Sequence, residues 1–296
     1  MQNKQNVQIP QQAFDWYDEY AHGGMDRRTF LNKLGTLSVV GLSLSVISSA
    51  LIPNYALAQQ VSFNDSDISA TYASFDSPTG HGRGEGYLVV PTNKTGLLPV
   101  VLVIHENRGL NPYIKDVARR LAKEGYIAFA PDILATLGGY PGNDDDGRAM
   151  QKGMDKVNIE QDFIAAAQFL KQHANSNGNL GAVGFCFGGY IVNFLAAAAP
   201  DLLTAGVPFY GTPASANIRQ NIKAPLLLQY AELDKRVNKS WPDYQEDLNA
   251  INAVYTKHMY LGANHGFHND STSRYNEIQA KLAWERTLDF FKVHLA

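Results

Sequence analysis

Short, unbroken apolar runs separated by amphipathic stretches constrain the fold of this chain most strongly. Runs rich in Val, Ile, Leu and Phe occupy residues 87–91, 100–106, 126–134, 180–186, 205–211, 224–234 and 257–267. Apolar residues at helical spacing fill residues 113–125, 158–173, 190–199 and 276–295. Strands that are apolar on both faces and alternate with helices are typical of a mostly parallel sheet covered on both sides. The pattern therefore predicts an α/β fold in which ligands bind at the carboxyl ends of the strands.

The composition is that of a globular domain with a large core. The chain has 296 residues, of which 45% are hydrophobic, and its formal net charge is -3. This weak charge gives no electrostatic reason to expect nucleic acid or an anionic membrane as a partner. The single cysteine excludes an intrachain disulfide and any metal site made of several cysteines.

The N-terminal part has the features of an export signal. The arginine pair Arg27–Arg28 is followed by a moderately apolar run from Leu34 to Ile52 and by the small-residue pattern Ala56–Ala58. The stretch "RRTFL" resembles a twin-arginine signal, which implies recognition by the twin-arginine export machinery and a periplasmic or secreted protein. We expect residues 1–58 to be a cleaved leader and residues 59–296 to form one hydrolase-like domain without stable membrane insertion.

Two points about this leader stay open at the level of sequence. The apolar run is long enough to span a membrane, so a retained anchor is the alternative to cleavage. Met25 is an alternative start to Met1, because a long polar and aromatic stretch precedes the arginine pair.

The most specific local motif surrounds the only cysteine. The sequence "GFCFGG" has the form G-x-C-x-G, with an apolar strand before it and a helix after it. This is the pattern of the nucleophile elbow of α/β-hydrolases, with Cys186 in place of serine. Gly184 and Gly188 are needed because side chains there would collide in the tight turn. The N-terminus of the following helix favours a thiolate and an oxyanion. The alternative is an inert, buried cysteine.

A cysteine nucleophile needs a base, and the base needs an acceptor that orients it. In α/β-hydrolases these residues follow in the order nucleophile, acid, base. Downstream of Cys186, Asp234 ends one strand, and His265 lies in the loop after the last strand. We therefore predict the triad Cys186–Asp234–His265.

Other residues compete for these two roles. Glu232 is the rival of Asp234, but it lies within the transition from strand to loop. Among the eight histidines, His268 is the nearest rival of His265, which the preceding "GAN" turn and the following glycine favour. Four other histidines are in less suitable places, namely before the export signal, near helix ends or at the start of a strand: His22, His173, His294 and His258.

A carboxylate at the end of an earlier strand makes the resemblance to a known family specific. Glu106 and Asn107 follow the strand "VVLVIH", in the loop that supplies an oxyanion-hole N–H group in this fold. Together, "IHENRGL", "GFCFGG", "AELD" and "NHGFHND" resemble the dienelactone hydrolases, also called carboxymethylenebutenolidases. The resemblance runs from about residue 80 to the C-terminus in one register.

The resemblance implies roles for particular residues. Glu106, Cys186, Asp234 and His265 form the site, and a neutral resting thiol lies near Glu106, which accepts its proton when substrate binds. The thiolate then attacks a lactone or ester carbonyl. Backbone N–H groups of Phe187 and Asn107 stabilise the oxyanion, each contributing on the order of 3 kcal/mol. Water hydrolyses the thioester with His265 as base.

One feature departs from the family pattern. Dienelactone hydrolases hold a substrate carboxylate with two arginines, one of them four residues after the catalytic histidine, where this chain has Asn269. Arg274, Arg148 and Arg108 are the candidates for substrate contact, so an anionic substrate stays open and dienelactone itself is in doubt. Residues 138–147 are interpreted as a mobile loop beside the pocket.

The sequence thus predicts an exported hydrolase that cleaves a small-molecule ester or lactone and needs no metal or organic cofactor. One alternative is a binding or redox-sensing protein that uses Cys186 on a hydrolase scaffold without turnover. A second alternative is acyl transfer, or cleavage of an amide, by the same residues.

Overall fold

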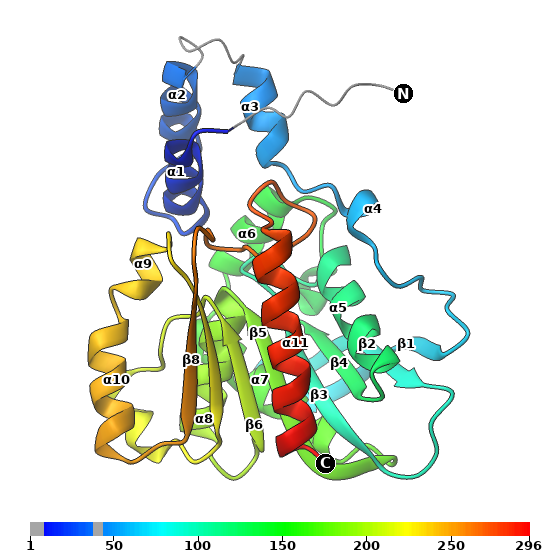
Figure 1. Cartoon of the computed structure of the whole chain (residues 1–296). Coiled ribbons are helices and arrows are strands. Elements are labelled where there is room, and N and C mark those ends of the chain that lie inside the picture. Colours follow the sequence, from blue (N-terminus) through cyan, green and yellow to red (C-terminus); the bar gives the residue numbers. More distant parts are fainter. Residues whose placement is uncertain (1–8, 38–43) are drawn as a thin grey trace.

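The computed structural model describes residues 9–37 and 44–296 and contains one eight-stranded sheet flanked by helices (Figure 1). The strands are β1 (Ile68–Ser77), β2 (Gly82–Pro91), β3 (Leu98–Ile104), β4 (Ile127–Asp132), β5 (Ser176–Phe185), β6 (Ala205–Phe209), β7 (Leu226–Ala231) and β8 (Tyr255–Tyr260). Their order across the sheet is β1-β2-β4-β3-β5-β6-β7-β8. In this order, neighbouring strands from β4 to β8 run parallel to each other. The pairs β1–β2 and β2–β4 are antiparallel. The predicted mostly parallel sheet is confirmed.

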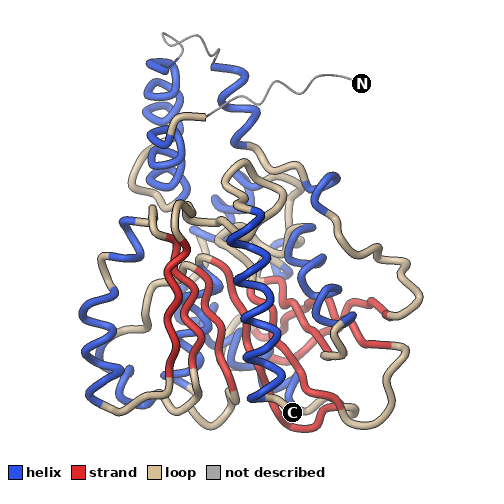
Figure 2. Tube along the Cα trace, viewed as in Figure 1, coloured by secondary structure: helices blue, strands red, loops and turns tan. Residues whose placement is uncertain are grey.

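The helices cover both faces of this sheet (Figure 2). They are α5 (Pro112–Lys123), α6 (Asp144–Lys152), α7 (Lys156–Lys171), α8 (Phe187–Ala198), α9 (Lys235–Asn238), α10 (Trp241–Ala250) and α11 (Glu277–His294), with 3-10 turns η2 (Ala135–Leu137) and η3 (Ala216–Asn221). Alternate residues of β3 face opposite sides. Val101 and Val103 pack with side chains of α5 and α11, whereas Val100 and Leu102 pack with those of α7 and α8. This alternation explains why the strand is apolar throughout.

Some boundaries and elements differ from the prediction. The last strand ends at Tyr260, and residues 261–276 form turns that carry the loop with His265. The segment 138–147, predicted as a mobile loop, is a loop only up to Asn143, because its acidic run begins helix α6. Asn143 caps this helix by accepting a hydrogen bond from the N–H of Asp146, and three aspartates in the first turn suit the helix dipole.

The N-terminal part folds against the same edge of the sheet where the parallel strands end (Figure 1). It contains α1 (Gln11–Ala21), α2 (Arg27–Leu37), α3 (Leu44–Leu51) and the short α4 (Tyr55–Ala58). The first three helices share a small apolar core that includes Tyr17, Phe30, Leu34 and Ile47. Part of the predicted apolar run, residues 38–43, lies outside the described residues. Within the described ranges, no helix is long and apolar enough to cross a membrane.

Candidate active site

Cys186 lies at a sharp turn between β5 and α8. Its backbone has φ 58° and ψ −110°, and L-residues rarely adopt a positive φ. A Cβ atom on Gly184 would collide with the backbone of Gly188, and one on Gly188 would collide with the carbonyl of Ile104. These glycines therefore allow the start of α8 to pack closely against the ends of β3 and β5. This packing places Cys186 above the edge of the sheet.

Asp234 and His265 come together at the ends of β7 and β8. Asp234 Oδ2 accepts a hydrogen bond from His265 Nδ1 at 2.5 Å, and both side chains are buried. The rival Glu232 is exposed and accepts a hydrogen bond from the backbone N–H of Gly262 instead. The rival His268 is buried in the core, where its Nδ1 pairs with the Tyr113 hydroxyl at 2.6 Å. The structure thus brings together the acid and base that strand order predicted.

The charges at this site favour a thiolate paired with imidazolium. Burial alone would raise the pKa of the Cys186 thiol, but the neighbouring His265 and His22 more than offset it and hold that pKa well below its usual value. Burial alone would lower the pKa of His265, but the carboxylate of Asp234, together with Cys186 and Asp18, raises that pKa to about 10. The Cys186 thiol therefore sits among cationic groups, the environment that activates cysteine nucleophiles.

Two backbone N–H groups stand where an oxyanion hole is expected. Phe187 is the first residue of α8, so its N–H has no partner within the helix. Asn107 follows the end of β3, which pairs with β5 through Ile104 and Gly184. Among the described residues, neither N–H donates a hydrogen bond. Both N–H groups are therefore available to donate to a ligand.

Glu106 is buried nearby but does not hydrogen-bond to the thiol. Its Oε2 accepts a hydrogen bond from Asn269 Nδ2 at 3.0 Å, and its Oε1 lies 3.6 Å from Arg108 Nη2. Asn269, which occupies the position of a family arginine, is thus a partner of Glu106. The resting contact between Glu106 and Cys186 that the family resemblance implied is replaced by a contact of Cys186 with His22.

The three predicted arginines occupy different surroundings. Arg108 is buried and pairs with Asp144 at 2.5 Å, so it supports the fold beside the site. Arg274 is buried, with its guanidinium 4.7 Å from the ring centre of Tyr17. Arg148 alone lines the cavity next to Cys186, where it pairs with Asp145 and stacks over Tyr20. Of the three, only Arg148 is placed to meet a ligand in that cavity.

A family comparison agrees with this geometry. The family model described as "Dienelactone hydrolase family" matches residues 85–295, which include the elbow, the Asp–His pair and Glu106. The chain belongs to the dienelactone hydrolase family. A second family model, described as "YqhI-like", matches residues 1–39.

Curated relatives and solved structures support the same placement of this dienelactone hydrolase family member. "Putative hydrolase fragment YghX" of Escherichia coli K12 is 61% identical over 108 residues, which are 36% of this chain and 92% of that relative. A "Putative carboxymethylenebutenolidase" of Aquifex aeolicus is 35% identical over 214 residues, covering 67% of this chain and 89% of the relative. The crystal structure of a putative dienelactone hydrolase from Klebsiella pneumoniae matches with a TM-score of 0.65 and 28% identity, over 76% and 99% of the two chains. The predicted family and the α/β-hydrolase fold are confirmed.

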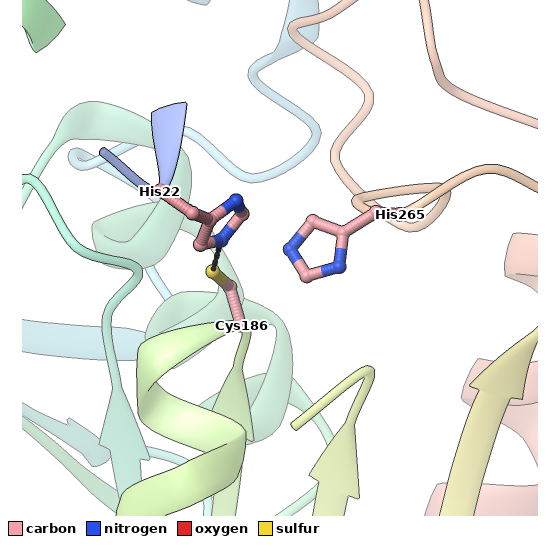
Figure 3. Close-up of side chains that lie close together, drawn as sticks. All are labelled: His22, Cys186 and His265. Carbon is pink, nitrogen blue, oxygen red and sulfur yellow. Dashed lines mark hydrogen bonds between the residues drawn. The ribbon is translucent and has the colours of Figure 1, made fainter. Parts of the chain in front are cut away.

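The dienelactone hydrolase site contains a histidine that the sequence analysis set aside. His22, at the end of α1, places its Nε2 3.2 Å from the Sγ of Cys186. Figure 3 shows its ring beside that of His265, above the sulfur, and the ring centres are 4.9 Å apart. His22 was discounted because it precedes the predicted export signal. Only the docking of residues 9–37 onto the strand ends reveals it, and no spacing in the sequence signals this contact.

Two further residues at the site were also missed. Arg236, two residues after Asp234, places Nη2 3.0 Å from His22 Nε2 and 3.4 Å from His265 Nδ1. Tyr210 follows β6 with φ 39°, and its buried hydroxyl has no hydrogen-bond partner among the described residues. Both residues line a cavity of about 780 Å³ together with Cys186. This size suits a small-molecule ligand.

The site also holds three atoms of the kind that bind soft metal ions. One atom each from His22, Cys186 and His265 lies within 4.8 Å of the others. Bond lengths to tetrahedral zinc of about 2.1 and 2.3 Å require nitrogen and sulfur to be roughly 3.6 Å apart. The His22–Cys186 distance of 3.2 Å is shorter and is that of a hydrogen bond.

Proposed function

We propose that this protein hydrolyses a carboxylic ester or lactone through Cys186, with a thioester intermediate. The observation that carries the proposal is a thiol on a strained elbow, within a site that contains a hydrogen-bonded Asp234–His265 pair. Membership of a hydrolase family supports the reaction class. Thiol, imidazole and backbone N–H groups are sufficient for acyl transfer to water.

The proposed reaction has two halves. The Cys186 thiolate attacks the substrate carbonyl, and the N–H groups of Phe187 and Asn107 stabilise the oxyanion. The C–O bond then breaks, and an imidazolium gives its proton to the departing alkoxide. In the second half His265 takes a proton from water, hydroxide attacks the thioester, and the thiol is restored. A lactone yields one hydroxy acid by these steps, whereas an ester yields an acid and an alcohol.

Substitution of the nucleophile tests this proposal. We expect Cys186→Ala to lower the hydrolysis of small aryl esters and lactones by at least about 10⁴-fold, since no other group forms the covalent intermediate. Rapid quenching of the unaltered protein should trap a mass increase of one acyl group on the peptide containing Cys186. Undiminished turnover by Cys186→Ala would reject the assignment.

Two outcomes of the same assays favour the alternatives. Alkylation of Cys186 without any turnover of esters or lactones favours a binding or redox-sensing thiol. Transfer of the acyl group to added alcohols or amines in preference to water favours an acyltransferase.

We also propose that the arginine pair directs export of the chain. Arg27 and Arg28 begin α2, and both are exposed, so a folded precursor displays them. Cell fractionation of the unaltered chain and of a variant with Arg27→Lys and Arg28→Lys tests this. Equal periplasmic amounts of the two proteins would contradict the proposal, because twin-arginine recognition distinguishes arginine from lysine at this pair.

A further inference from the structure

Asp18 and His22 form a second acid–imidazole pair next to the nucleophile. They lie four residues apart, Asp18 on α1 and His22 at its end, so they share one helix face. His22 Nδ1 lies 2.8 Å from the backbone carbonyl of Asp18 and 3.1 Å from its Oδ1. On the other side of the ring, Nε2 lies 3.2 Å from Cys186 Sγ. The arrangement repeats that of Asp234 and His265 from the opposite end of the chain.

The partners of the ring determine where its proton lies. Both atoms next to Nδ1 are oxygens that can only accept, because the carboxylate is ionised. Nδ1 must therefore carry hydrogen, so in the neutral ring Nε2 carries the lone pair, and both Cys186 Sγ and Arg236 Nη2 lie within hydrogen-bond distance of it. A neutral imidazole in this orientation accepts the thiol proton, so the geometry is that of a general base.

The N-terminal segment, residues 9–37, is held at the site by contacts with the catalytic domain. Asn107 Nδ2 donates a hydrogen bond to the Ala21 carbonyl at 2.7 Å, and Arg236 Nε donates to Asp18 Oδ2 at 3.2 Å. The segment does not fill the space beside the thiol. Instead, residues 20–23 and Met25 form one wall of the cavity of about 780 Å³ that Cys186 also lines. A segment that lines the cavity without filling it is better explained as part of the active site than as an inhibitory segment that blocks it.

We propose that His22 is a second catalytic base for Cys186, that Asp18 is its positioning residue, and that the N-terminal segment is part of the working enzyme. This inference rests on the proposed function of Cys186 as nucleophile. It also excludes cleavage after Ala58, because cleavage would remove His22. The placement of that predicted cleavage site agrees, since Ala58 is buried and ends a short helix whose Tyr55 hydrogen-bonds to Asp144.

The proposed step is a proton transfer followed by attack. The S–H bond of Cys186 breaks before substrate binds: its proton passes to Nε2 of His22, the electron pair stays on sulfur, and the resting site holds the thiolate. The thiolate attacks the carbonyl and forms the thioester, and the His22 imidazolium returns the proton to the departing alkoxide. Acylation removes the Cys186 thiolate, one of the charges that raise the pKa of His265, so this ring can release its proton and then accept one from the attacking water.

The groups around His22 act in opposite directions. Asp18 on α1 and the Cys186 thiolate favour the imidazolium form, whereas Arg236 on α9 and the imidazolium form of His265 disfavour it. Burial also disfavours the charged ring, yet on balance the pKa of His22 is raised above its usual value. Glu106 accepts a hydrogen bond from Asn269, and the ring of Tyr210 packs against His265. Removing His22 should therefore raise the pKa of the Cys186 thiol.

The test measures the rate of Cys186 alkylation by iodoacetamide against pH on the full-length chain, with a chelator present. We expect His22→Gln to move the midpoint of alkylation upward by about one pH unit, and to slow alkylation by about tenfold at pH values below the midpoint of the unaltered chain. Asp18→Asn should move the midpoint in the same direction by less. Glu19→Gln, one position along the same helix, and His173→Gln, near the end of α7, are matched controls that should leave the profile unchanged.

Hydrolysis gives the second measurement. We expect His22→Gln to lower kcat by about 10²-fold, the usual contribution of a general base, with a smaller change in KM. Added imidazole should restore part of the activity of His22→Ala but not of Cys186→Ala. This rescue separates a lost base from a protein that has failed to fold.

Two results would overturn the inference. The first is an alkylation profile of His22→Gln that coincides with that of the unaltered chain. The second is an increase in hydrolysis by His22→Ala, because that would show that the segment inhibits the site. Alkylation does not depend on turnover. If the protein does not hydrolyse esters or lactones, the alkylation profile still tests whether His22 lowers the pKa of the Cys186 thiol.

Discussion

Two acid–imidazole pairs each place a ring nitrogen within 4.8 Å of the same sulfur, but the fold holds them in different ways. Asp234 and His265 lie 31 residues apart, on loops after two neighbouring strands, and their side chains are only 1% and 5% exposed. Asp18 and His22 are four residues apart at one end of a helix, and each is 18% exposed. The first pair is fixed by the sheet, whereas the second depends on the docking of the N-terminal segment. We therefore expect the first pair to be indispensable and the second to adjust the rate.

The largest difference should appear when each base is removed. We expect His265→Gln to lower kcat/KM by about 10⁴-fold, since His265 serves in water attack and its charge helps to hold the thiolate. This loss should exceed that of His22→Gln by about 10²-fold. Initial rates on an aryl ester provide the measurement, with His173→Gln as the control. Equal losses in the two variants would remove the proposed division of roles.

Substitution of the two aspartates should rank the two pairs in the same order, with smaller losses of activity. Asp234→Asn should lower kcat by about 10³-fold, because an amide no longer stabilises the imidazolium form of His265. Asp18→Asn should lower it by about tenfold, because Asp18 is more exposed and solvent screens its charge. Steady-state rates measured on both variants and on Glu19→Gln test the ranking. A greater loss in Asp18→Asn would contradict it.

The pH dependence of the unaltered protein tests both pairs at once. The pKa of Cys186 is lowered and that of His265 is raised to about 10, so thiolate and imidazolium coexist across neutral pH. The alkylation rate should therefore be flat from about pH 6 to 9, and at pH 6 it should exceed that of an ordinary thiol with a pKa of about 8.5 by roughly 10²-fold. A rate that rises tenfold per unit up to pH 8 would show that neither pair stabilises the thiolate.

The smallest expected effect concerns a residue outside both pairs. Tyr210→Phe should lower kcat/KM by about fivefold, the value of one neutral hydrogen bond to substrate, because Tyr210 lines the cavity and its hydroxyl has no partner among the described residues. Tyr230→Phe is the matched control, since its buried hydroxyl also has no partner in the described part of the chain but packs against Trp241. A similar loss in both variants would point to stability rather than to substrate contact.

Much of the catalytic domain followed from local patterns in the sequence. The run "GFCFGG" requires glycines on both sides of Cys186 for steric reasons, and the structure shows the collisions that other residues would cause. Apolar runs predicted the strands. The order nucleophile, acid, base along the chain, with each residue at the end of a strand, predicted Asp234 and His265. The acidic run at residues 144–146, predicted as part of a loop, starts α6 instead, because the side chain of Asn143 caps this helix.

The surroundings of the nucleophile depended on contacts between distant parts of the chain. Glu106 could be located from the sequence, but its hydrogen bond with Asn269 joins two loops 163 residues apart. His22 lies 164 residues from Cys186, and a segment with an arginine pair and an apolar run is typical of a removable leader. No periodicity or spacing links such positions.

The sequence by itself determined the α/β fold, the elbow and the acid and base that follow it. Their signals are local: strand periodicity, small residues in a tight turn, and the rule that parallel strands end at one edge of the sheet. Only the tertiary structure decided which imidazole contacts the sulfur, which oxygens orient that imidazole, and which side of the cavity the N-terminal segment lines. These features arise from docking one segment onto another, and docking depends on the shape and charge of two complementary surfaces, which no single stretch of sequence contains.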